Sequence, residues 1–311
     1  MVHKRMCRWK RRGMIAVLSG IVGPAFGCAA GDGGSASEEG ALALRVSGED
    51  AAKKGYPVLK KGRELAFVDG WTVTFDKLIV SIGDIELRGA DGASAFKDES
   101  IYVADLHRGD PTIAVFEGLE ARRWERFGLK ILPATPDAVN LNGVSQADVE
   151  RMASNGYNYW VEGAATKGGE RYTFGWGLVN PTRNSNCTNG LDGTDGFVVK
   201  SHATTEAEIT VHVDHTFWDT LGSEVADLRF DAIAAAAGDD GHIDFDELDA
   251  QRLSDLKGLD GGPLLDESGA PIIYNPGSIP LEARTLKHFV LAASASQAHI
   301  NGLGLCTVSA L

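Results

Sequence analysis

Two histidines and an aspartate stand within four positions of the chain, at His212, Asp214 and His215. Imidazole nitrogens together with a carboxylate oxygen form the kind of donor set that holds zinc or copper in proteins. In a second arrangement only the imidazoles bind the metal, and Asp214 fixes the tautomer of one of them through a hydrogen bond. A third interpretation involves no metal, only histidines at a strand end that are solvated or bonded to a backbone carbonyl. The stretch is therefore the first candidate metal site.

A further ligand has to come from a distant part of the sequence. The candidates are four histidines, namely His107, His202, His288 and His299. We expect His299, because it lies close to Cys306. A disulfide between Cys306 and Cys187 would draw this end of the chain toward the strand that carries His212.

The cysteines support that disulfide. Of the four in the chain, Cys7 and Cys28 belong to the N-terminal export signal described below, which leaves Cys187 and Cys306 as one pair. A single pair in an oxidising compartment favours a disulfide. A bridge over so long a loop stabilises a fold by about 4–5 kcal/mol in the chain-entropy model. The other interpretation is a thiolate metal ligand.

A second candidate site is a glycine-centred acidic loop at residues 236–247. With Gly241 at the sixth of twelve positions, oxygen ligands at positions 5, 7, 9 and 12 fall on Asp240, the carbonyl of His242, Asp244 and Glu247. This loop resembles an EF-hand, and the resemblance implies calcium bound between two helices within residues 223–253. Positions 1 and 3 are Ala236 and Gly238, which carry no ligand oxygen.

Strand patterns dominate the elements that must position these residues. Short apolar or alternating runs, bounded by Gly, Pro and Asp, occupy residues 71–75, 77–87, 101–106, 112–116 and 126–132. Strands at such spacing predict a sandwich or barrel. We expect one mainly β domain over residues 41–311, α+β overall, with the EF-hand-like helices as an insertion.

The strand predicted over residues 208–213 carries the first candidate site. Ile209, Val211 and Val213 alternate with polar residues, so one face should be buried. The alternation places His212 and Asp214 together on the opposite face.

Helices are expected at four places. Ser145 has the form of a cap for a helix starting there, and good helix formers occupy 223–237. A short helix should begin at about residue 245, and another at about Leu281.

Residues 157–178, between the helix at Ser145 and the one over 223–237, are predicted to form a hairpin around Gly168. Its aromatic residues predict core packing or, in an alternative, a sugar-stacking platform; they are Trp160, Tyr172, Phe174 and Trp176.

The N-terminus is typical of an exported protein. Six basic residues in the first twelve precede an apolar run that stops at Cys28. The boundary Ala-Phe-Gly-Cys resembles the lipobox of bacterial lipoproteins. The resemblance implies a signal peptide at 1–27, acylation of Cys28 (by palmitate, for example), and retention in the outer membrane, facing the periplasm or the surface. Residues 28–40, small and polar, are expected to be a flexible tether.

The net charge and the absence of catalytic motifs limit the classes of function that the sequence allows. Loss of the six basic residues takes the formal net charge from −13 to −19, and so acidic a chain will not bind nucleic acid non-specifically. Catalytic signatures such as GxSxG, HExxH or a P-loop are absent from the sequence. We expect a non-enzymatic, lipid-anchored envelope protein that binds a divalent metal. The alternative is an envelope protein that binds a carbohydrate or other ligand through the 157–178 hairpin.

Overall fold

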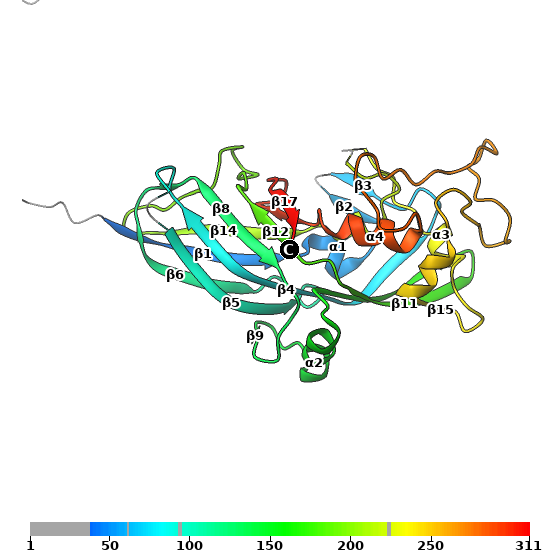
Figure 1. Cartoon of the computed structure of the whole chain (residues 1–311), viewed down its shortest axis with the longest axis horizontal. Coiled ribbons are helices and arrows are strands. Elements are labelled where there is room, and N and C mark those ends of the chain that lie inside the picture. Colours follow the sequence, from blue (N-terminus) through cyan, green and yellow to red (C-terminus); the bar gives the residue numbers. More distant parts are fainter. Residues whose placement is uncertain (1–37, 61, 93–94, 223–224) are drawn as a thin grey trace, which may run out of the picture. The chain divides into compact units, whose positions relative to one another are not determined.

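The computed structural model describes residues 38–60, 62–92, 95–222 and 225–311 (Figure 1). The predicted signal peptide, the predicted acylation site at Cys28 and most of the predicted tether lie outside these residues. The end of that tether prediction is wrong, because strand β1 (Glu39–Ser47) already begins at Glu39. Gly40 lies against the chain at Lys200, where a Cβ would come within 2.1 Å of the carbonyl oxygen. Glycine is therefore required by close strand packing here, not by a flexible tether.

The smaller of the two main sheets has four strands in the order β16 (Ala298–Ile300), β14 (Thr204–Val211), β1 and β6 (Thr112–Glu120). β1 pairs with β14 in parallel, whereas its pairing with β6 and the β14–β16 pairing are antiparallel. β14 therefore lies between β1, which is near the N-terminus, and β16, which is near the C-terminus. The sheet carries the first candidate site at the end of β14.

The larger sheet has nine strands built around β4 (Thr72–Arg88). Its path is β15 (His242–Asp244), β11 (Glu170–Leu178), β10 (Tyr159–Lys167), β4, β8 (Arg126–Ile131), β12 (Thr182–Ser185) and β17 (Thr307–Ala310), with β5 (Ala95–Asp105) on β4 and β9 (Val139–Asn140) on β5. The sequence predicted two strands where β4 is one. The chain stays extended through Asp76 because a register shift at Glu162 and Gly163 of β10 absorbs the irregularity.

Smaller elements complete the fold. Two further two-stranded sheets pair β2 (Val58–Lys60) with β3 (Arg63–Leu65), and β7 (Arg123–Trp124) with β13 (Phe197–Val198). The helical elements are α1 (Glu49–Lys54), α2 (Gln146–Asn155), η1 (Val213–Phe217), α3 (Asp231–Ala234), η2 (Phe245–Ala250) and α4 (Leu286–Ser294).

The main core combines apolar side chains of both sheets, such as Leu44 of β1, Val80 of β4 and Ile209 of β14, each 0% exposed. A second, smaller core forms where α2 covers the other face of β4 and β5 (Figure 1). Ser145 caps α2 as predicted, its hydroxyl accepting the backbone N–H of Asp148 at 3.1 Å. The predicted fold class is confirmed: the chain is mainly β and sandwich-like, with a small helical part.

The predicted helix over 223–237 is wrong in its extent. Only α3 is α-helical, and residues 225–230 are not. Leu228 instead forms isolated bridges with Phe67 and Trp218 and is 2% exposed. The carboxylate of Asp219 also accepts the backbone N–H of Asp227. Burial of Leu228 and this polar anchor override the local helix preference.

One other helix boundary differs from prediction, and one predicted helix has its expected start but a different helical type. The C-terminal helix begins at Leu286, after the cap residue Thr285, and not near Leu281. The helix expected from about residue 245 is the 3₁₀ helix η2, capped by a reciprocal pair of hydrogen bonds between Asp244 and Glu247.

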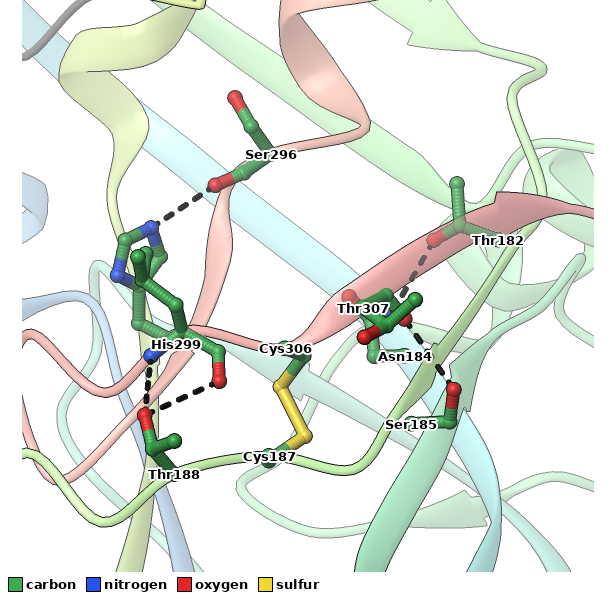
Figure 2. Close-up of a disulfide and its surroundings, with 10 residues drawn as sticks. Thr182, Asn184, Ser185, Cys187, Thr188, Ser296, His299, Cys306 and Thr307 are labelled. Carbon is green, nitrogen blue, oxygen red and sulfur yellow. Dashed lines mark hydrogen bonds between the residues drawn. A yellow bond between two sulfur atoms is a disulfide. The ribbon is translucent and has the colours of Figure 1, made fainter. Parts of the chain in front are cut away.

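The Cys187–Cys306 disulfide is present, as predicted (Figure 2). It closes a loop with a sequence separation of 119 and joins the chain after β12 to the residue just before β17. Among the residues that the structure describes, no helix combines the length and the apolar character needed to cross a membrane.

Candidate metal centre

The candidate centre forms where β14 ends. The strand stops at Val211, so the prediction of a strand through Val213 is wrong: His212 caps η1, and Val213 and Asp214 lie inside it. The expected division into a buried and an open face also fails, because His212 is 3% exposed and Val213 1%. The turn into η1 redirects the side chains that a continuous strand would have separated.

His212, Asp214 and His215 offer ligand atoms that all lie within 4.8 Å of one another. All three are buried, and they line a cavity of about 640 Å³ together with His299 and Trp218. Within the described ranges, no other set of His, Cys, Asp and Glu residues meets this geometry. The group can therefore hold a metal ion, and the cavity gives an ion a route to it.

The structure places His299 beside this group, as the disulfide argument predicted. Strand β16 pairs with β14 so that His299 is opposite Thr210. The His299 ring lies 4.4 Å from that of His212 and 5.4 Å from that of His215, between ring centroids. His299 is therefore near enough to be a further ligand after a modest side-chain movement.

The hydrogen bonds of His212 and His215 fix where their protons are. Nε2 of His212 lies 2.7 Å from the carbonyl of Gly302, which only accepts, so this nitrogen carries the hydrogen. Nδ1 of His215 lies 2.9 Å from the hydroxyl of Ser296, whose own hydrogen goes to the carbonyl of Ala293. His215 must donate from Nδ1. The lone pairs of the neutral rings are thus on Nδ1 of His212 and Nε2 of His215.

The position of the ring hydrogen of His299 also follows from its hydrogen bond. Its Nε2 donates to the carbonyl of Ser296 at 3.0 Å, and Figure 2 shows this bond beside the disulfide. Its Nδ1 is buried and has no hydrogen-bond partner. Histidines that bind metals in proteins usually donate their other ring hydrogen to an oxygen acceptor, which holds the ligating nitrogen in place. All three imidazoles have this form.

Burial controls the charge of these groups. It holds the pKa of His215 well below its ordinary value, and the neighbouring His212, His299 and Lys60 lower it further. Burial, with the neighbouring His212 ring, also lowers the pKa of His299 to about 4. Both rings are therefore neutral at pH 7, the form that binds metal. For Asp214, burial raises the pKa, while the Lys60 ammonium opposes the shift.

The other histidines considered as ligands lie elsewhere. His107 bonds to the carbonyl of Ala52, and His202 is exposed. His288 lies on α4, next to Thr285 and Asp249. None of these three is part of the centre.

In the EF-hand-like loop, two of the predicted carboxylate ligands accept backbone N–H groups of the loop itself. The Asp240 carboxylate accepts the N–H of His242, and Glu247 accepts the N–H of Asp244. His242 to Asp244 form β15, which pairs in parallel with β11. A Cβ at Gly238 would lie 3.1 Å from Oε1 of Glu247 and 3.9 Å from Oδ1 of Asp240, so these two oxygens approach the same side of the loop.

The aromatic hairpin at 157–178 forms as predicted, from β10 and β11. Phe174 and Trp176 are 0% exposed and belong to the main core. Tyr172 contacts Trp71, and Trp160 stacks on Tyr157. The hairpin therefore presents no continuous aromatic platform to a ligand.

Two charged residues of the centre were not predicted from the sequence. Nζ of Lys60, at the end of β2, lies 2.8 Å from Nδ1 of His212 and 2.7 Å from Oε2 of Glu49, at the start of α1. Both are more than 150 positions from His212 in the sequence, and no local pattern marks either of them. Only tertiary contacts bring them to the site.

Comparison with known protein families, with curated proteins and with solved structures gives no match for this chain. The geometry of the residues themselves therefore supports a metal site without help from any relative.

Proposed function

We propose that the protein is a non-enzymatic, lipid-anchored component of the bacterial cell envelope that binds one transition metal ion. His212, Asp214 and His215 are the ligands, with His299 available as a further one. Nitrogen-rich sets of this kind favour zinc or copper over calcium or magnesium. The lipobox-like segment ending at Cys28 supports anchoring, and the disulfide supports an oxidising compartment.

One observation carries the metal proposal. His212, His215 and His299 each have one ring nitrogen satisfied by an oxygen acceptor, and ligand atoms of His212, His215 and the Asp214 carboxylate lie within 4.8 Å of one another. Leaving the buried Nδ1 of His299 without a partner costs free energy. A bound cation would use that lone pair and recover that cost.

The test is cell fractionation followed by elemental analysis of the full chain, expressed with its own N-terminus. We expect the protein in the membrane fraction, with about one equivalent of zinc or copper after detergent extraction and dialysis. His212→Ala and His215→Ala should each remove the metal. His288→Ala is the matched control and should retain it.

Metal retained by both His212→Ala and His215→Ala would contradict the proposed ligands. Absence of any stoichiometric metal from the wild-type protein would overturn the function. Recovery of the wild-type protein in the soluble fraction would overturn the lipid anchor alone.

Calcium at the EF-hand-like loop is a separate proposal. The approach of the Asp240 and Glu247 oxygens to one side of Gly238 favours it, together with the carbonyl ligand expected at His242. Ala236 and Gly238 supply no side-chain oxygen, so water would have to complete the coordination.

A further inference from the structure

An ammonium group lies where a metal ion would bind. Nζ of Lys60 is 2.8 Å from Nδ1 of His212, the nitrogen that carries the lone pair, and 2.7 Å from Oε2 of Glu49. Nδ1 of His212 itself lies 3.4 Å from Oε2 of Glu49 and 3.8 Å from Oδ1 of Asp214. The lysine is thus held by the nitrogen and carboxylate donors that suit a cation.

Glu49 is held in an unusual backbone conformation. Its φ is 54°, in the left-handed region that costs free energy for residues other than glycine. Ser47 accepts its N–H at 3.2 Å and supports this geometry. Such strain at the start of α1 is consistent with a residue whose carboxylate has to be presented at a particular place.

We propose that Lys60 is a built-in competing cation: it fills the centre in the metal-free protein, and a divalent metal ion displaces its ammonium and recruits Glu49 as an additional ligand. The inference rests on the proposed metal site and adds two residues to it. Lys60 thereby sets the threshold concentration at which the ion binds.

The surroundings allow Lys60 to move. Its side chain lines the large cavity with the histidines, and also a smaller cavity of about 170 Å³ on the side of Glu49 and Asp50. A rotation into the smaller cavity would carry the ammonium away from His212 and toward a second carboxylate. The charges agree with an exchange, since Glu49 and Asp214 together balance one divalent ion but leave a net negative charge when Lys60 alone is present.

The experiment compares zinc affinity between the wild-type chain and Lys60→Met, measured by competition with a chromophoric chelator. Methionine keeps the length of the side chain and removes its charge. We expect zinc to bind Lys60→Met at least about tenfold more tightly, because a like charge has left the site. Glu49→Gln should bind at least about tenfold more weakly. Lys54→Met, which removes a charge from the exposed end of α1, is the matched control and should bind as the wild type does.

A second measurement uses the wild-type chain alone and does not depend on how a variant folds. Labelling by a lysine-reactive ester, followed by peptide mass spectrometry, should increase at Lys60 when zinc is added. Labelling at Lys54 should not change.

The outcomes separate the two proposals. Zinc binding that is unchanged or weaker in Lys60→Met, or Lys60 labelling that is unaffected by zinc, would overturn the displacement while the metal site stands. Zinc binding by Lys60→Met but not by the wild type would mean that zinc does not displace Lys60, and would overturn both the displacement and metal binding by the wild-type protein. No zinc on either protein would overturn both proposals.

Discussion

At the scale of single residues, the neutral state of His299 and His215 makes the fold sensitive to acid. The pKa of His299 is about 4 in the folded protein, because burial disfavours the charged ring, against about 6.5 in an unfolded chain. The unfolded chain therefore binds more protons between these values. The contribution of the neutral ring to the free energy of unfolding is complete above about pH 6.5 and is lost as the pH falls toward 4.

We expect the free energy of unfolding of the metal-free protein to fall by roughly 2–3 kcal/mol over this range from His299 alone. Urea denaturation at pH 7.5, 5.5 and 4 measures it. His299→Gln should lose less stability over the range, and His202→Gln, at an exposed position, should behave as the wild type. An equal loss in His299→Gln would show that this ring does not set the acid limit.

The individual residues of the centre were predictable to different degrees. His212, Asp214 and His215 are neighbours in sequence, so their proximity required only a turn at the end of a strand. His299 came from a long-range constraint, the Cys187–Cys306 pair. Lys60 reaches the site from the short β2–β3 hairpin through its contacts with His212 and Glu49, and no pattern within its own segment marks it.

At the scale of elements, Glu247 has two separable roles in the EF-hand-like loop. Its carboxylate caps η2 by accepting the N–H of Asp244, and in the calcium proposal it is also the twelfth-position ligand. Glu247→Ala should therefore lower the free energy of unfolding by about 1 kcal/mol and abolish calcium binding.

Glu247→Gln separates capping from calcium binding, because glutamine can still cap the helix but carries no charge. Calorimetric titration with calcium should show weakened binding in this variant, with stability close to wild type. A calcium signal that persists in Glu247→Ala would place any bound calcium elsewhere.

Element boundaries were predicted best where local and tertiary preferences agree. α2 has its cap at Ser145 and an apolar side that meets β4 and β5, so pattern and packing coincide. The helix expected over 223–237 failed because Leu228 finds a better buried position in bridges with Phe67 and Trp218. Such a competition depends on partners about ten and 160 positions away, which periodicity cannot reveal.

At the scale of the whole molecule, the disulfide links stability to the metal centre. It ties the segment that follows His299 to the chain after β12. The double variant Cys187→Ala, Cys306→Ala should lower the free energy of unfolding by about 4–5 kcal/mol in the chain-entropy model. Its zinc affinity should also fall, since β16 would be held less firmly beside β14.

Denaturation and chelator competition on this variant measure both effects without a thiol reductant that would itself bind zinc. The variant His288→Ala, with the disulfide intact, provides the reference for affinity. An unchanged zinc affinity would mean that the β14–β16 pairing alone positions His299.

The distance along the chain between the ligands has a consequence for proteolysis. His212, Asp214 and His215 are close neighbours, whereas His299 reaches the centre through β16 and lies only a few residues before Cys306. A product cleaved before residue 299 that loses the following segment would keep most of the core and still lack His299 and the disulfide. Metal content would then distinguish intact molecules from cleaved ones, since only a chain that retains residues 299–306 can assemble the complete set of ligands.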